Sequence, residues 1–188
     1  MSAILTTAWR LFLLLTVLTG CFYPLLMTGI AQGCFPWQAN GSMLIEQDQY
    51  WGSQWIGQNF VTPDYFWGRP SATANGAYNG LASGGSHLGP THPALLDSVR
   101  KRISERKTGQ SPIPADLVLA SGSGLDPEIS PAAAYYQMDR VATARNIPVA
   151  ELDRLIQMHT QWRMFGLLGE PRVNVLLLNH ALDLYKRG

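Results

Sequence analysis

The hydrophobic pattern divides the chain into one long apolar segment and a more polar remainder. Residues 11–31 contain no charged side chain, and the next charged residue along the chain is Glu46. At 1.5 Å per residue, a helix over this segment would be about 31 Å long, enough to cross the hydrocarbon core of a bilayer. Trp9 precedes the segment and Trp37 follows it, as an aromatic belt at each interface requires. The pattern predicts a transmembrane helix at 11–31.

Three residues inside this segment indicate contacts with other membrane helices. Pro24 removes one backbone donor and predicts a kink, which is tolerated where a neighbouring helix covers the freed carbonyl. Gly20 and Gly29 leave room for the close approach of a second helix. These positions are the candidates for packing of the span within a membrane complex.

Two other interpretations of the apolar segment stay open. A secretory signal has an apolar region of about 7–15 residues and a small-residue cleavage site, whereas this segment is longer and lacks the site. Leu18-Thr19-Gly20-Cys21 resembles the cleavage box of a bacterial lipoprotein, with Cys21 as the lipidated residue. The apolar sequence after Cys21 is unlike the polar tether of a lipoprotein, so an uncleaved span is favoured.

The charges on either side of the span predict its orientation. Arg10 lies on the N-terminal side, the first charges on the other side are Glu46 and Asp48, and the first basic residue there is Arg69. Positive charge is retained on the cytoplasmic side of a membrane. We therefore expect a cytoplasmic N-terminus at 1–10, a span at 11–31, a juxtamembrane linker at 32–41 and a soluble extracytoplasmic domain at 42–188.

In that domain the pattern predicts short strands first and helices later. Aromatic residues punctuated by glycine and proline favour strands at 57–61 and 64–68, and an apolar run favours a third at 116–120. A helix is expected at about 93–107, with Thr91 as its cap and a buried stripe made of Leu95, Leu96, Val99 and Ile103.

Three further helices have clear start signals or periodicity. Ser130-Pro131 is a strong N-terminal signal, and the helix it opens should end near Arg145, before Asn146. Residues 149–160 place Leu152, Leu155, Ile156 and His159 on one face, and residues 174–187 form a last helix capped by Asn174. The expected fold class is one N-terminal transmembrane helix plus a single α+β (mixed α/β) domain.

Composition excludes several classes of protein. Charged residues make up 14% of the 188 positions, and the formal net charge is +1. A Lys/Arg run is missing, so nucleic acid is not an expected partner. The two cysteines, Cys21 and Cys34, lie in or beside the apolar segment, which excludes a disulfide scaffold.

Candidate catalytic chemistry is weak throughout. Ser121 or Ser123, His87 or His92, and Asp126 could supply a serine hydrolase, but the G-x-S-x-G elbow is missing. The glycine-rich stretches at 82–90 and 121–124 lack the lysine of a phosphate loop, and Asp126 would repel phosphate. Tight turns that need glycine explain both stretches.

The histidines and Arg69 provide little further evidence of a functional site. The four histidines, 87, 92, 159 and 180, have no carboxylate at metal-ligand spacing, so no metal site is expected. Arg69 follows three aromatic residues. It could stack on one of them or form a structural ion pair, for example with Asp64.

Six ordered segments carry a family resemblance: "TVLTGCFYPLLMTGIAQ", "FPWQANGSM", "IGQNFVTPDYFWGRPSA", "ASGGSHLGPTHPALL", "DLVLASGSGLDPEISPAAA" and "GEPRVNVLLLNHALD". The chain resembles, nearly end to end, the C subunit of the bacterial Kdp potassium-importing P-type ATPase. Cys21 departs from that pattern, where an ordinary apolar residue is expected.

The resemblance implies a place in a complex. The family's C subunit sits in the bacterial inner membrane by one helix, with a channel-like potassium-binding subunit, a P-type pump subunit and a small single-helix subunit as partners. It implies no catalysis by the chain itself, and a role in stabilising the complex and supporting ATP-coupled potassium uptake. The alternative is a catalytic chaperone that raises the pump subunit's affinity for ATP. No cofactor is expected on the chain directly. A domain outside the membrane could not bind cytoplasmic ATP. ATP would therefore act only through the complex.

The same segments supply the candidate partner-contact or motif residues. They are Gln58, Asn59, Phe60, Tyr65, Phe66, Gly68, Arg69, Pro70, Ser71, Ser83, Gly84, Gly85, Gly122, Gly124 and Asp126.

Overall fold

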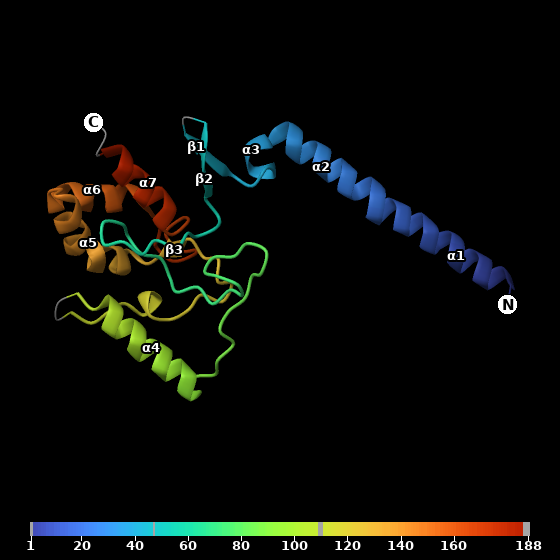
Figure 1. Ribbon diagram of the computed structural model, residues 1–188. Helices are drawn as coiled ribbons and strands as arrows, with labels where there is room; N and C mark the ends of the chain where they lie inside the picture. The colour runs from blue at the N-terminus through green and yellow to red at the C-terminus, as the bar shows by residue number, and fades with distance from the viewer. Residues whose placement is uncertain (1, 47, 109–110, 186–188) are drawn as a thin grey trace. The chain divides into compact units, whose positions relative to one another are not determined.

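The computed structural model describes residues 2–46, 48–108 and 111–185. These form two compact units, Met1–Ser53 and Gln54–Gly188 (Figure 1). The hairpin of β1 (Met43–Glu46) and β2 (Gln49–Ser53) belongs to the first unit, although the sequence had assigned residues from 42 onward to the soluble domain.

The N-terminal unit begins with a long apolar helix. It consists of α1 (Ser2–Val17), a π-helical turn (Leu18–Phe22) and α2 (Tyr23–Cys34). The helical stretch Ser2–Cys34 is long and apolar enough to cross a membrane, and none of the residues in its most apolar part is buried. The predicted helix at 11–31 is therefore present and extends further at both ends.

The irregularity expected at Pro24 takes the form of the π-helical turn. The N–H of Tyr23 donates to the carbonyl of Leu18, five residues back. Pro24 lies in the first turn of α2, where its missing N–H costs little. A π-bulge of this kind is one of the recognised causes of local bending in helices.

The residues predicted to form a juxtamembrane linker, 32–41, are largely helical. Helix α2 continues to Cys34, and α3 (Pro36–Ala39) follows after one residue. The indole Nε1 of Trp37 donates to the carbonyl of Met43 at 3.0 Å. The chain leaving the apolar helix is thus tied to the start of the hairpin.

In the C-terminal unit, three helices and a small antiparallel sheet share one core. The strand order is β3-β5-β4, and α5, α6 and α7 all contact β5. This mixed helix and sheet domain confirms the predicted fold class. The elements are β3 (Glu128–Ile129), α5 (Pro131–Arg145), α6 (Val149–His159), β4 (Thr160–Gln161), β5 (Arg172–Asn174) and α7 (Val175–Tyr185).

Local capping explains where these helices begin and end. The hydroxyl of Ser130 accepts from the N–H of Ala133, and Asn146 ends α5 in the left-handed conformation at φ 55°. The side chain of Asn174 accepts from Leu177 at the start of α7. All three signals were predicted from the sequence and are confirmed.

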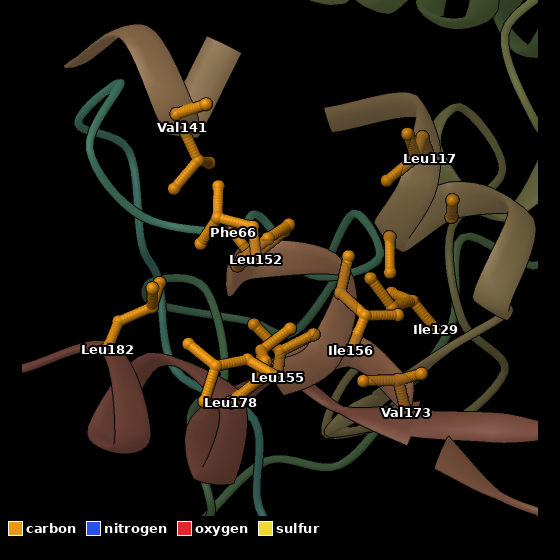
Figure 2. Packing of buried hydrophobic residues seen from close by; sticks show 14 residues of the cluster. Phe66, Leu117, Ile129, Val141, Leu152, Leu155, Ile156, Val173, Leu178 and Leu182 are labelled. Atoms are coloured by element: carbon orange, nitrogen blue, oxygen red, sulfur yellow. The ribbon is translucent and has the colours of Figure 1, made fainter. Parts of the chain in front are cut away.

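The core lies where the helices and the sheet meet (Figure 2). Leu152 and Ile156 of α6 face Leu178 of α7 and Val173 of β5, and all four are fully buried. Phe66 joins them from a loop. Burying side chains of this size contributes about 1.5–3 kcal/mol each.

The predicted strands at 57–61 and 64–68 are wrong, because this region is an extended loop. Its backbone finds partners on helix side chains instead of a neighbouring strand. Asn179 accepts from the N–H of Phe66 and donates to its carbonyl, both at 2.9 Å. Gln137 does the same for Trp67, at 2.8 and 3.1 Å. Each buried amide replaces the pair of hydrogen bonds that a strand would have supplied.

The segment at 116–120 is also not a strand. Residues Ala115–Leu117 form one 3-10 turn, and the side chain of Leu117 points into the core. The apolar run was short, and periodicity alone does not separate a short buried strand from a turn.

Helix α4 (Pro93–Arg106) occupies the predicted position but differs in cap and burial. The Nδ1 of His92, rather than the hydroxyl of Thr91, accepts from the N–H of Ala94. The helix has no buried residue, so the expected stripe of Leu95, Leu96, Val99 and Ile103 is wrong.

Polar contacts hold α4 instead. Arg102 donates to the carbonyl of Val118, and Arg106 donates to those of Gly68 and Leu117. Both arginines bind the segment at 117–118, and Arg106 also ties the helix to the loop that carries the candidate residues.

Candidate functional site

Seven candidate residues from two parts of one loop line a common pocket of about 200 Å³. They lie on either side of the aromatic run at 65–67. Helix α4 contributes three charged side chains to the same pocket. The lining residues are Gln58, Asn59, Phe60, Gly68, Arg69, Pro70 and Ser71, with Ala77, Tyr78, Arg102, Glu105 and Arg106.

Tyr78, which the sequence did not single out, organises this pocket. Its hydroxyl donates to the carbonyl of Arg69 at 2.5 Å, and its N–H donates to the hydroxyl of Ser71 at 2.9 Å. A Cβ on Gly57 would lie 2.3 Å from the Tyr78 ring, and one on Gly68 would lie 2.6 Å from its hydroxyl. The two glycines leave the space that the ring fills.

We expect the free energy of unfolding to fall above pH 10 because of the Tyr78 phenol. Burial raises the pKa of Tyr78 from 10.0 to about 12. The folded protein therefore keeps the phenol neutral where the unfolded chain ionises. The contribution is present below pH 10 and is lost between pH 10 and 12, by about 2–3 kcal/mol. Near-UV circular dichroism during denaturant unfolding of the full chain, at several pH values, measures it.

Two phenylalanine variants separate this phenol from the others. Tyr78→Phe removes the group, so its unfolding free energy should depend less on pH across that window. Tyr50→Phe, at an exposed position of the N-terminal unit, should keep the original dependence. Equal profiles for the two variants would contradict the assignment to Tyr78.

Arg69 forms its ion pair with Asp126, not with Asp64 as suggested. The distance between Arg69 Nη1 and Asp126 Oδ2 is 2.9 Å. Asp126 Oδ1 also accepts from the N–H of Glu128, so the carboxylate joins the loop to β3. Asp64 instead lies 3.8 Å from Arg145.

Other arginines occupy the aromatic faces that Arg69 was expected to reach. The guanidinium of Arg140 lies 3.7 Å from the ring centre of Trp67, and that of Arg106 lies 5.7 Å from it. Burial, followed by repulsion from Arg106, lowers the pKa of Arg140 to about 10, which leaves it charged at neutral pH. Arg140 also donates to the carbonyls of Pro63 and Tyr65, so it holds the loop in place.

Tyr65 and Phe66 lie outside the pocket. Phe66 belongs to the core, whereas the hydroxyl of Tyr65 donates to Asp183 of α7 at 2.9 Å. The guanidinium of Arg145 lies over the Tyr65 ring and pairs with Asp183 at 2.7 Å. The aromatic run therefore anchors the loop between its two groups of pocket residues.

The remaining candidates form a second cluster, in which two glycine-rich loops meet. Ser83 and Gly84 donate to the carbonyl of Ser123 at 3.0 and 2.8 Å. A Cβ on Gly85 would lie 2.9 Å from the carbonyl oxygen of Gly122. Gly124 has φ +68°, and a Cβ there would collide with the carbonyl oxygen of Gly84. Because these residues are glycines, the backbones of the two glycine-rich loops can pack in direct contact.

The residues considered for a serine hydrolase have structural roles instead. The hydroxyl of Ser121 accepts from the N–H of Gly124, and that of Ser123 accepts from the N–H of Leu125. His92 caps α4, and Asp126 pairs with Arg69. Within residues 2–46, 48–108 and 111–185, no group of three His, Cys, Asp or Glu side chains is placed to hold a metal ion.

Ser123→Ala should therefore change the stability of the C-terminal unit only slightly. The exposed hydroxyl makes one hydrogen bond in a turn, and such a bond contributes about 0.5–1.5 kcal/mol. Ser121→Ala, which removes a buried hydroxyl from the same turn, should cost more stability. Thermal unfolding of the full chain compares the two variants. A Ser123→Ala variant that loses as much stability as Ser121→Ala would contradict the turn assignment.

A larger pocket of about 540 Å³ is lined by both members of the Arg69–Asp126 pair. Four carboxylates and two guanidinium groups line it, for a local net charge of −2 (2 − 4). Burial raises the pKa of one carboxyl, that of Glu128, despite its ion pair with Arg172. The charged residues are Asp116, Asp126, Glu128, Glu170, Arg69 and Arg172.

Comparison with known proteins identifies the family. The family model described as "K+-transporting ATPase, c chain", KdpC, matches residues 5–184. The chain belongs to the KdpC family. The resemblance drawn from the six sequence segments is confirmed.

Curated KdpC proteins match almost end to end. The potassium-transporting ATPase KdpC subunit of Polynucleobacter asymbioticus is 54% identical over 187 residues, covering 97% of this chain and 99% of the relative. That of Paraburkholderia phytofirmans is 54% identical over 182 residues, covering 95% of each. That of Herpetosiphon aurantiacus is 55% identical over 178 residues, covering 93% and 92%.

Proposed function

We propose that this chain is a non-catalytic subunit of a potassium-transporting ATPase and that it stabilises the assembled complex. The observation that carries the proposal is the end-to-end match to KdpC subunits, which includes the apolar helix. The channel-like potassium-binding subunit, the P-type pump subunit and the small single-helix subunit are the proposed partners.

The geometry of the candidate residues supports a structural role. Arg69, Ser71 and Asp126 are engaged in bonds that shape loops, and Tyr78 fills the space between two glycines. Catalytic groups usually face a reacting centre, whereas these side chains form bonds that stabilise loops and turns. Such a rigid surface suits recognition by another subunit.

We further propose that the helix crosses the bacterial inner membrane once, with the N-terminus in the cytoplasm and the C-terminal unit outside. Arg10 before the apolar stretch supports this orientation, because the next basic residue along the chain is Arg69. Leu81→Cys provides the test, because Leu81 is 99% exposed. In a background without Cys21 and Cys34, a membrane-impermeant maleimide should label it in intact spheroplasts. Ser2→Cys should react only after lysis.

Assembly should depend on the small residues of the span. Gly29 has open space around its Cβ position in the isolated chain, so leucine there would fill a surface needed by a neighbouring helix. We expect Gly29→Leu to reduce co-purification of the other subunits from membranes several-fold, and Gly20→Leu to act likewise. Leu25→Ile, a conservative change in the same helix, should retain them. A wild-type chain that never brings down the other subunits would defeat the proposal.

The rival function, raising the affinity of the pump subunit for ATP, has less support. The pocket of about 200 Å³ is below the usual range of small-molecule sites, roughly 300–1,000 Å³. The pocket of about 540 Å³ is large enough, but its excess of carboxylates would repel a polyphosphate. Cytoplasmic labelling of Leu81→Cys, together with a lower ATP affinity of complexes that lack this chain, would favour the rival.

A further inference from the structure

The hairpin between β4 and β5 presents an unusual set of apolar side chains to solvent. Five large apolar residues within seven positions are exposed, and Phe165 and Leu167 at the tip are 89% and 82% exposed. Residues 164–169 include no charged side chain. Exposed apolar patches of this kind mark contacts with proteins or membranes. The five residues are Trp162, Met164, Phe165, Leu167 and Leu168.

Hydrogen bonds and an ion pair give the hairpin a defined conformation. Met164 and Leu168 exchange two backbone hydrogen bonds, at 2.9 and 3.0 Å. At its base, Arg163 Nη2 lies 2.6 Å from a carboxylate oxygen of Glu170. Phe165 has φ 54°, the left-handed region that favours glycine. A bulky ring is thus held in solvent on a strained backbone.

Four backbone N–H groups of the tip are already satisfied within the hairpin. The N–H groups of Met164, Gly166, Leu167 and Leu168 all donate to carbonyls within the hairpin. A segment that enters hydrocarbon must satisfy its backbone in this way, because lipid offers no replacement for water.

We infer that the tip of this hairpin, residues 164–168, inserts into the interfacial layer of the membrane that the N-terminal helix spans. The inference rests on the proposed anchoring, because the C-terminal unit follows in sequence the unit that contains the apolar helix. The tip would reach about 5–10 Å into the boundary between headgroups and acyl chains.

The order of side chains along the hairpin favours lipid over a protein groove. Phe165, Leu167 and Leu168 form the tip, Trp162 lies further back, and the Arg163–Glu170 pair closes the base. This matches the layers of a bilayer surface, where apolar side chains lie deepest, tryptophan lies at the interface and charges meet the headgroups. The side chains at 164–169 offer no strong hydrogen-bonding group with which a protein partner could fix an orientation.

A fluorescent label on the hairpin tests the inference. The full-length chain, with Cys21 and Cys34 replaced by serine, is reconstituted into phosphatidylcholine and phosphatidylglycerol vesicles. Leu167→Cys carries an environment-sensitive nitrobenzoxadiazole label, and Leu81→Cys on another loop is the matched control. Spin-labelled lipids should quench the label at 167 at least about twofold more than the label at 81, and iodide should quench it less.

Charged substitutions at the tip provide the second measurement. Phe165→Asp with Leu168→Asp, in the Leu167→Cys chain, should return the label to an aqueous environment. Both side chains are exposed, so circular dichroism of the unit should not change.

Three results would overturn the inference. The first is equal lipid quenching at 167 and 81. The second is a blue shift at 167 that needs the other subunits and occurs without lipid quenching, which would indicate a protein groove. The third is a shift that follows the protein-to-lipid ratio, which would indicate a second copy of the chain. Flotation of the vesicles checks anchoring independently. A chain that does not float defeats the proposed span and this inference together, whereas a floating chain with a solvated tip defeats only the inference.

Discussion

Arg145→Ala should lower the free energy of unfolding of the C-terminal unit by about 3–5 kcal/mol, the usual effect of removing one partner from a buried ion pair. The Arg145 side chain is only 4% exposed, and its Nη1 lies 2.7 Å from Asp183. Its Nε donates to the carbonyl of Asp64 at 2.6 Å, and its guanidinium lies over the ring of Tyr65. Alanine would leave Asp183 without its cation and free the loop that carries the pocket residues.

The measurement is thermal unfolding of the full chain in detergent, followed by near-UV circular dichroism. The midpoint should fall on the order of 10 °C for a unit of this size. Arg154→Ala is the matched control, because Arg154 is also a helix arginine paired with a carboxylate but its side chain is 72% exposed. Exposed pairs of this kind contribute about 0.3–0.5 kcal/mol. Similar losses for the two variants would show that the Arg145 network does not stabilise the unit.

Gly124→Ala should have the second large effect, a loss of about 2–5 kcal/mol. A left-handed backbone costs a non-glycine residue about 1–2 kcal/mol, and forced overpacking costs about 1–3 kcal/mol more. Gly124 has φ +68°, and its Cβ would lie 2.5 Å from Thr73 Cγ2 and 2.6 Å from the carbonyl oxygen of Gly84. The second contact is with backbone, so a side-chain rotation cannot relieve it.

Gly122→Ala is the control two residues away. Its Cβ would meet no atom within 4 Å, and its φ is not positive, so alanine should be tolerated. By sequence both glycines are candidate residues. The structure shows that only Gly124 lacks space for a side chain. Denaturant unfolding of both variants gives the comparison, and an equally stable Gly124→Ala would refute the close packing of the two glycine-rich loops.

The helices of the C-terminal unit were predictable because their signals are local. Ser130-Pro131 and Asn146 specify where α5 begins and ends, and Leu152, Leu155 and Ile156 recur at helical spacing on α6. The strands at 57–61 and 64–68 were wrongly predicted because the partner of that backbone is not local. Gln137 and Asn179 bind it across 70 and 113 residues of sequence. A polar residue directly after an apolar run, such as Asn179 in "VLLLNHAL", was the available signal.

The pocket was predictable only in part, for a similar reason. The segment from Gln58 to Ser71 was found as a motif, and seven of its residues line one pocket. Tyr78, Arg102 and Arg106 were missed, since a tyrosine in a loop and arginines on an exposed helix have no distinguishing pattern. The predicted partner of Arg69 was wrong because Asp64 is near it in sequence, whereas Asp126 is near it in space.

The sequence by itself determined the apolar helix, the family and the helical second half of the C-terminal unit. Each depends on order along the chain: a run of apolar residues, motifs in succession, or caps a few residues apart. Only the tertiary structure decided which side chains support the aromatic loop, which carboxylate pairs with Arg69, and why Gly124 but not Gly122 must be glycine. It also showed that the β4–β5 hairpin leaves its apolar tip uncovered. These features depend on contacts between residues far apart in sequence, and their geometry exists only after the chain has folded.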